Sequence, residues 1–304
     1  MYKTEYSLRY FRRALPIYFM LLPGVLFFVI FKYVPMFGIS IAFQEYNPFQ
    51  GFWKSDWVGI EHFQRLFEEQ QFLLLLKNTL LLNLLDIFVF FPAPILFAVL
   101  LNEVQLKWFK KSVQTIVYAP HFLSWVVIVG MTVLLFATQK GSINQQLAAW
   151  GFERIELMTD PVYFRLVWVL QNIWHGVGWS AIIFLAALAA VNPSLYEAAV
   201  VDGAGRLRQI WHITLPALRN VIVIVFIIRL GNFMDIGFEH IYLLQNPLNL
   251  SVSDVFDTYV YRNGIAKGEF SYSAAVGLFK SIVGLVMVIG ANTIAKKMGQ
   301  EGVY

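Results

Sequence analysis

The sequence contains no cysteine and few charged residues. The absence of cysteine among 304 residues excludes disulfides, zinc-thiolate sites and iron-sulfur clusters. Only 14% of the residues are charged, whereas 58% are hydrophobic and 17% are aromatic. A water-soluble domain would need more charge to cover its surface, so the composition is typical of a membrane protein. Basic cytoplasmic loops account for the formal net charge of +4, and we predict no nucleic-acid partner.

Motifs for catalysis and nucleotide binding are also missing. The chain has no Gly-Lys dipeptide and therefore no P-loop, and it has neither a His-Glu-x-x-His nor a Gly-x-Ser-x-Gly motif. The histidines are scattered over predicted loops and span ends without metal-ligand spacing: His62, His121, His175, His212 and His240. We therefore expect no bound cofactor, no metal and no enzymatic activity in this chain. Any ATP, with its Mg, must be bound and hydrolysed by a partner.

Six hydrophobic runs are each long enough to cross a bilayer once. They lie near residues 14–42, 72–102, 114–137, 165–190, 217–244 and 272–295. Lys and Arg favour the connections assigned to the inner side, most clearly Lys107, Lys110 and Lys111, which places both termini in the cytoplasm. The sequence thus predicts an all-α, polytopic protein of the plasma (inner) membrane, with residues 1–304 as one transmembrane domain.

Residues 192–216 are the one substantial stretch between hydrophobic runs that is predicted to build helices of its own. Ser194 and Glu197 have the spacing of a capping box, which predicts a helix start, and Gly203 ends that helix. Beyond it, apolar residues recur at i, i+3, i+4 and i+7. This spacing predicts a second short helix, closed by Pro216.

The same stretch resembles the EAA loop of permease subunits in binding-protein-dependent ABC importers. The pattern is Glu197-Ala198-Ala199, three residues, Gly203, nine residues, Ile213, one residue and then Leu215-Pro216. In that family the loop is the coupling helix that enters a cleft on a cytosolic ATPase subunit. The resemblance implies that the following residues couple to the ATPase: Glu197, Ala198, Ala199, Asp202, Gly203, Ala204, Ile213, Leu215 and Pro216. A structural interpretation stays open, in which Glu197 only caps its helix and the small residues pack the loop against the membrane helices.

Three further segments resemble the branch of these importers that handles oligo- and polysaccharide fragments. They are Phe31-Lys32-Tyr33-Val34-Pro35 through Ala42-Phe43, Trp57-Val58-Gly59 with Phe63, and Asp254-Val255 with Thr258-Tyr259-Val260-Tyr261-Arg262. The resemblance implies an ABC importer type I permease fold that works by alternating access. It also implies a second permease subunit, usually a different chain, two cytosolic ATPase subunits and an extracytoplasmic solute-binding protein, all acting within membrane lipid.

Polar and aromatic side chains within the spans are candidates for a translocation path. An ionised group at bilayer depth costs at least ~2.5 kcal/mol, and sugars offer an apolar ring face beside a rim of hydroxyls. The candidates are Lys32, Asp86, Asn172, Trp174, Trp179, Arg229, Asn232, Asp235, Glu239 and Tyr242. The charged members have a second interpretation as interhelical ion pairs or snorkelling groups. The basic groups Lys32, Arg229 and Lys280 suggest a cargo with uronic-acid carboxylates.

Two other classes of protein are weighed against the importer. An ion-coupled secondary transporter predicts inverted repeats and helices broken at corresponding positions in two halves, but Pro92 and Pro94 have no clear counterpart. A polytopic membrane enzyme would need a catalytic constellation at one interface, and the sequence offers none.

Overall fold

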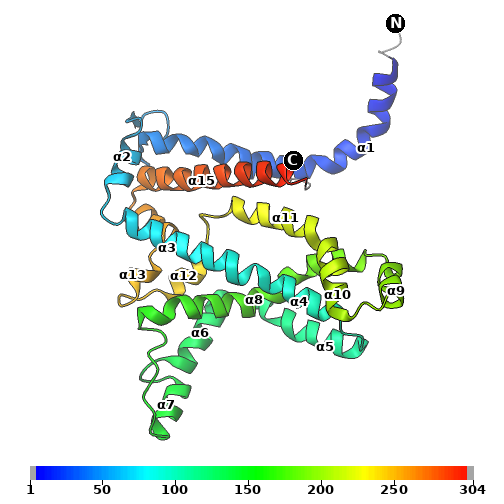
Figure 1. Ribbon diagram of the computed structural model, residues 1–304. Helices are drawn as coiled ribbons and strands as arrows, with labels where there is room; N and C mark the ends of the chain where they lie inside the picture. Colours follow the sequence, from blue (N-terminus) through cyan, green and yellow to red (C-terminus); the bar gives the residue numbers. More distant parts are fainter. Residues whose placement is uncertain (1–4, 300–304) are drawn as a thin grey trace. The chain divides into compact units, whose positions relative to one another are not determined.

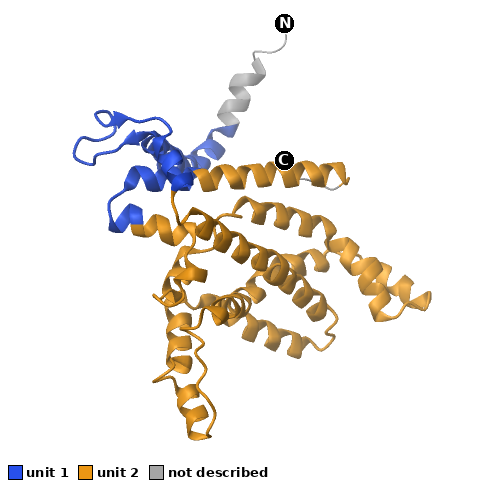
Figure 2. Ribbon diagram, turned by 60° about the vertical axis from the view of Figure 1, so that its left-hand side comes forward, with its two compact units in different colours: residues 1–68, 263–278 blue, residues 69–262, 279–304 orange. Residues whose placement is uncertain are grey.

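The computed structural model describes residues 5–299 of the chain. It is almost entirely helical and divides into two compact units (Figure 2). The first unit comprises residues 1–68 and 263–278, and the second comprises residues 69–262 and 279–304.

The first unit begins with one long helical segment, which changes from α-helix to π-helix and then to 3-10 helix. It contains α1 (Glu5–Phe28), a π-helical turn (Val29–Tyr33), a 3-10 segment (Val34–Phe43), the hairpin strands β1 (Gln44–Glu45) and β2 (Asp56–Trp57), α2 (Glu61–Glu68) and the start of α15 (Phe270–Lys297). Arg65 holds the unit together, because its guanidinium lies 2.8 Å from the Glu269 carboxylate and 4.2 Å from the centre of the Tyr272 ring. The span Ala14–Phe43 is long and apolar enough to cross a bilayer, and its most apolar window has no buried residue.

The second unit holds most of the helices. In chain order it contains α3 (Phe72–Leu85), a π-helical turn (Asp86–Phe90), α4 (Pro92–Asn102), α5 (Lys107–Tyr118), a 3-10 turn (Ala119–Phe122), α6 (Trp125–Phe136), α7 (Ser142–Ala149), α8 (Pro161–Ala189), α9 (Pro193–Val201), α10 (Arg206–Gln209), a π-helical turn (Ile210–Thr214), α11 (Leu215–Gly231), α12 (Phe238–Leu244), α13 (Leu250–Ser253) and α14 (Phe256–Val260). A further π-helical turn, Tyr261–Ala266, leads back to the first unit.

Helix α8 is the centre of the second unit. Helices α4 and α5 lie along it (Figure 1), and a Cβ at Gly178 would collide with the carbonyl group of Val117 on α5. One apolar cluster joins α8 to α4 and α11 through Ala98, Phe184 and Leu218, which are at most 1% exposed. Close packing of this kind fixes the position and rotation of α8. It therefore also fixes the direction of the side chains on the other faces of α8.

Five helical stretches are long and apolar enough to cross a membrane. They are Ala14–Phe43, Phe72–Asn102, Pro161–Ala189, Arg206–Gly231 and Phe270–Lys297. A sixth results if the bent pair Lys107–Phe122 and Trp125–Phe136, which meet at 97°, counts as one span. The all-α, multi-pass architecture is therefore confirmed for the described residues.

The predicted bounds of the fifth span, 217–244, are wrong at both ends. The helix starts at Arg206 and ends at Gly231, and α12 follows only after Gly237, which adopts a left-handed φ of 85°. Hydropathy alone did not show this break because the residues on both sides of it are apolar. Gly237 permits the change of direction between the two helices, because glycine adopts a left-handed φ without steric cost.

The sequence predicted that Pro216 closes the second helix of the 192–216 stretch, and this prediction is wrong. The N–H of Leu215 bonds to the carbonyl of Ile210, five residues back, so a π-helical turn leads directly into α11. Pro216 then falls in the first turn of α11, where its missing N–H is tolerated.

Candidate functional site

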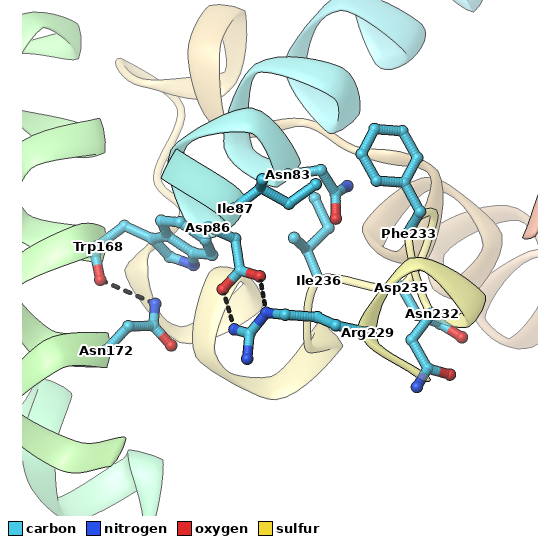
Figure 3. Close-up of a pocket in the computed structure, with 10 residues that line it drawn as sticks. All are labelled: Asn83, Asp86, Ile87, Trp168, Asn172, Arg229, Asn232, Phe233, Asp235 and Ile236. Carbon is cyan, nitrogen blue, oxygen red and sulfur yellow. Dashed lines mark hydrogen bonds and ion pairs between the residues drawn. The ribbon is translucent and has the colours of Figure 1, made fainter. Parts of the chain in front are cut away.

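A cavity of about 260 Å³ lies within the second unit (Figure 3). Its walls come from the end of α3 and the π-helical turn after it, from α8, and from the end of α11 with the loop that follows. The lining residues are Asn83, Asp86, Ile87, Trp168, Asn172, Arg229, Asn232, Phe233, Asp235 and Ile236. Half of the ten predicted path residues thus converge here from positions far apart in the sequence: Asp86, Asn172, Arg229, Asn232 and Asp235.

Asp86 and Arg229 form an ion pair on the cavity wall. Nε and Nη2 of Arg229 donate to the two carboxylate oxygens of Asp86, which is the two-pronged geometry of a strong Arg-carboxylate pair. The guanidinium also lies 4.6 Å from the centre of the Phe90 ring, a favourable cation-π distance. The side chains are 29% and 17% exposed, for Arg229 and Asp86 respectively. The third nitrogen, Nη1, is directed away from Asp86 (Figure 3).

A second charged cluster fixes the loop between α11 and α12. Nζ of Lys280 on α15 lies 2.8 Å from Oδ1 of Asp235 and also bonds to Oδ1 of Asp257. Burial raises the pKa of the Asp257 carboxyl against the opposing effect of the Lys280 charge. The cluster therefore ties one wall of the cavity, at Asp235, to α14 and α15.

The basic groups that the sequence offered for cargo carboxylates are thus largely engaged within the protein. Arg229 is paired with Asp86, and Lys280 with Asp235 and Asp257. For these five charged groups within or beside the spans, the ion-pair interpretation describes the structure. Lys32 lies in the first unit, on the exposed surface of the first span.

Behind the cavity, His240 is held in a polar and aromatic network. Its Nε2 lies 2.7 Å from Oε1 of Gln171, and its Nδ1 lies 3.3 Å from Nδ2 of Asn172. Since the amide nitrogen of Asn172 can only donate, Nδ1 is the acceptor and Nε2 carries the proton. The indole of Trp125 stacks on the imidazole at 3.7 Å between ring centres, and Trp168 lies parallel to it at 6.2 Å.

The histidines are therefore less scattered than the sequence indicated. His175 lies 4.3 Å from Trp125 and 5.2 Å from His121, whose ring stacks on Trp179 at 4.4 Å, all between ring centres. These contacts are ring stacking. Within residues 5–299, no group of three or more His, Cys, Asp or Glu side chains is arranged to hold a metal ion.

The remaining predicted path residues lie apart from this cavity. Trp174 and Trp179 on α8 are about half exposed, and Glu239 and Tyr242 on α12 are exposed as well. Tyr242 stacks on Phe238 at 5.1 Å between ring centres. Together with Lys32, these residues stay predictions as parts of the path.

Five cavity residues were missed in the sequence: Asn83, Ile87, Trp168, Phe233 and Ile236. Trp168 lies four positions before Asn172 and Asn83 three before Asp86, so each shares a helix face with a residue that had been singled out. Helical periodicity around the chosen polar residues would have found both.

Hydrogen bonds on Asp254 hold one of the sequence segments noted above, Asp254 to Arg262. Asp254 accepts two hydrogen bonds from Arg262, at 2.9 and 2.6 Å, and its carbonyl accepts one from Asn78 at 3.0 Å. The bond to Asp254 raises the pKa of Arg262. These contacts anchor α14 to α3, beside the cavity wall.

The 192–216 stretch folds as a helical hairpin with an exposed surface. Asn192, not Ser194, caps α9, since its Oδ1 accepts from the N–H of Ser194 at 3.1 Å, and the predicted capping box is wrong. Gly203 has φ 75°, and the N–H of Ala204 bonds to the carbonyl of Ala199, which closes α9. A hydrogen bond of 3.1 Å between the hydroxyls of Tyr196 and Thr214 joins the two arms.

No residue of α9 or α10 is buried. Glu197, Ala198, Asp202 and Gly203 are exposed. Large apolar side chains are exposed beside them: Leu195, Val200, Val201, Leu207 and Trp211. This apolar surface extends from α9 into the start of the helix Arg206–Gly231, and an exposed apolar patch is typical of a protein-protein or membrane contact.

Comparison with known proteins gives consistent matches over most of the chain. The family described as "Binding-protein-dependent transport system inner membrane component" matches residues 76–300. The polygalacturonan/rhamnogalacturonan transport system permease protein YteP of Bacillus subtilis (strain 168) is 54% identical over 288 residues, which cover 95% of this chain and 90% of YteP. Protein LplB of the same organism is 51% identical, over 95% of this chain and 91% of LplB.

Solved structures give the same result for the fold. A chain of a bacterial alginate ABC transporter, crystallised in complex with an alginate pentasaccharide-bound periplasmic protein, superposes with a TM-score of 0.89 at 39% identity, covering 98% of this chain and all of that one. A chain from a structure of a bacterial ABC transporter involved in the import of the acidic polysaccharide alginate matches with a TM-score of 0.87 at 40% identity, over 96% of this chain and 99% of that one.

Proposed function

We propose a transport mechanism and a cargo from one premise: this chain belongs to the family of binding-protein-dependent transport system inner membrane components. It is the multi-pass permease subunit of an ABC importer for carbohydrate. The proposal concerns its cargo, its energy source and the residues that serve them.

The proposed cargo is an acidic oligosaccharide that carries uronic-acid residues. The observation that supports it is the pair of relatives named above, one for polygalacturonan and rhamnogalacturonan and one for alginate, each matching nearly the whole chain. The cavity suits a sugar, because three asparagines and an Arg-Asp pair can hydrogen-bond to hydroxyls while Trp168, Phe233 and two isoleucines offer apolar surface.

Recognition of a carboxylate at this cavity would rest on Arg229 more than on the other span cations. Its Nη1 is the part of the guanidinium that Asp86 does not engage. Lys280 already bonds to two carboxylates. A cargo carboxylate would therefore either bind at Nη1 or take the place of Asp86 in the two-pronged pair.

The proposed energy source is ATP hydrolysis, with Mg, on two cytosolic partner subunits. The exposed surface of α9 and α10 is the segment through which this chain would contact an ATPase, and Glu197, Asp202 and Gly203 lie on it. A second permease subunit would complete the pathway, and a solute-binding protein would deliver the sugar from outside. Closure of the ATPases would move the 192–216 hairpin and, through the continuous helix Arg206–Gly231, the cavity wall at Arg229.

The decisive experiment is uptake into proteoliposomes that contain the complete complex. Labelled oligogalacturonide and a neutral oligosaccharide of equal length are compared, with and without internal ATP, and with a proton ionophore. We expect uptake that needs ATP, resists the ionophore and favours the acidic sugar. Uptake that collapses with the ionophore and proceeds without ATP would instead indicate an ion-coupled secondary transporter.

The role of Arg229 in cargo choice is tested with Arg229→Gln in the same assay. We expect the preference for the acidic sugar to fall, because the variant removes the positive charge at the cavity. The same Arg229→Gln change is compared with Arg229→Lys, which keeps the charge but loses the planar fork. Unchanged selectivity in Arg229→Gln would refute carboxylate recognition by Arg229 and leave the importer function standing.

A further inference from the structure

The indole N–H of Trp168 is a buried hydrogen-bond donor without a partner. The residue is only 2% exposed, and within residues 5–299 no atom accepts a hydrogen bond from Nε1. Buried donors in folded proteins are almost always paired, and the indole N–H of a buried Trp usually finds an acceptor. An unpaired donor of this kind, at the wall of a cavity, indicates an acceptor that occupies the cavity.

The indole ring is fixed in place by its neighbours. Trp168 belongs to the apolar cluster of α3, α6, α8 and α12, in which Leu82, Ile241 and Val255 are completely buried. On one side it lies parallel to His240, and the far face of His240 is covered by Trp125. Because this packing leaves the ring no room to turn, the direction of its N–H is preorganised.

The nearest polar groups are already committed to other partners. Both ring nitrogens of His240 are engaged, one by Gln171 and the other by Asn172. The carboxylate oxygens of Asp86 are both held by Arg229. Among residues 5–299, no atom accepts a hydrogen bond from Nε1 of Trp168, and this donor is left for a group that enters the cavity.

The cavity places this donor beside other groups suited to a sugar. Figure 3 shows the Trp168 ring on the same side of the cavity as Asp86 and the Arg229 guanidinium, with Asn172 one turn further along α8. An indole N–H can only donate, so it selects an acceptor oxygen. The asparagines can either donate or accept hydrogen bonds. Only Trp168 requires the bound group to be an acceptor.

We propose that Trp168 is a sugar-binding residue of the translocation path, whose N–H donates to a hydroxyl or carboxylate oxygen of the cargo as it passes the cavity. This inference rests on the proposed carbohydrate transport. The bound sugar oxygen accepts this hydrogen bond at a fixed point, which orients one sugar unit against the Asp86-Arg229 pair.

The test replaces Trp168 in the assembled transporter and measures the KM of ATP-driven uptake. Trp168→Phe keeps an apolar ring but removes the donor. Trp108→Phe on α5, 69% exposed and remote from the cavity wall, is the matched control. We expect the KM to rise roughly three- to tenfold in Trp168→Phe, as for the loss of one net hydrogen bond, and to stay at the wild-type value in Trp108→Phe.

A second variant separates binding from packing. Benzothienylalanine at position 168 preserves the bicyclic shape of tryptophan and lacks only the N–H, so it should assemble and melt like the wild type while showing the same rise in KM. A KM equal to that of the wild type in this variant would overturn the inference. Wild-type transporter that takes up no oligosaccharide at all would instead overturn the proposed function.

The choice of cargo identifies the acceptor oxygen. A larger rise in KM for an oligogalacturonide than for a neutral oligosaccharide of equal length assigns the acceptor to the carboxylate. Equal rises assign it to a hydroxyl that both sugars share. Either result supports the inference that Trp168 binds the cargo.

Discussion

Asp86 and Arg229, 143 positions apart in the sequence, meet in a two-pronged ion pair on the wall of the cavity. The pair resolves a problem that the composition poses, namely how charged groups persist within apolar helices. Each charge has its counter-charge in hydrogen-bond contact, so the cost of placing it there is offset. The pair also links the turn after α3 to the end of α11, the helix that continues from the 192–216 hairpin.

We first predict that this pair is energetically coupled. Asp86→Asn and Arg229→Gln should each lower the melting temperature of the detergent-solubilised permease, because each leaves a partly buried charge without its partner. The double variant should be more stable than the sum of the single changes implies, with a coupling energy of about 1.5–3 kcal/mol. Strictly additive effects would contradict this prediction and make the contact energetically neutral.

The second prediction concerns the exposed surface of α9. The double change Glu197→Lys with Gly203→Leu should abolish sugar-stimulated ATPase activity and ATPase docking while the permease pair still assembles. The lysine reverses the charge of the surface, and leucine is strained at the left-handed φ of 75°. Ser194→Ala, on the same helix, is the control and should keep full stimulation. If the double variant retains docking and stimulation, α9 is not the coupling element.

A third prediction follows from the cap of α9. Asn192→Ala should destabilise the helix by about 1 kcal/mol, because the N–H of Ser194 loses its acceptor. Ser194→Ala should have little effect, since its side chain does not cap the helix in the structure. Hydrogen exchange at the first turn of α9 measures both changes. A stronger effect of Ser194→Ala than of Asn192→Ala would restore the capping box that the sequence predicted.

The fourth prediction tests the contact of α11 with α15. A Cβ at Gly284 would lie 2.6 Å from the carbonyl oxygen of Gly231, so Gly284→Ala forces the two helices apart. We expect a loss of about 1–3 kcal/mol, visible as a lower melting temperature. Gly290→Ala on the same helix meets nothing within 4 Å and should be neutral or slightly stabilising. Equal melting temperatures for the two variants would show that this close approach is absent.

The sequence by itself determined the class of the protein and predicted which segment contacts an ATPase. Long apolar runs have to be satisfied by helices in a bilayer, so an all-α, multi-pass fold follows from composition and run length. The pattern from Glu197 to Pro216 lies within one hairpin. A short-range pattern of this kind can be recognised from the sequence without knowing the tertiary structure. The start of α9 was misassigned because Asn192 and Ser194 are both good capping residues, and only the backbone decides which of them takes that position.

Only the tertiary structure decided which polar groups meet. For Lys280 the sequence left open either an ion pair or a cargo carboxylate, and the structure bonds it to Asp235 and Asp257 from two other elements. Trp168 was not distinguishable from any other interfacial tryptophan until its unpaired N–H and the cavity beside it were known. The physical reason is that charge pairing, stacking and cavity formation depend on distances between segments that are remote in sequence, and these distances are set by how α8 packs against α3, α11 and α12.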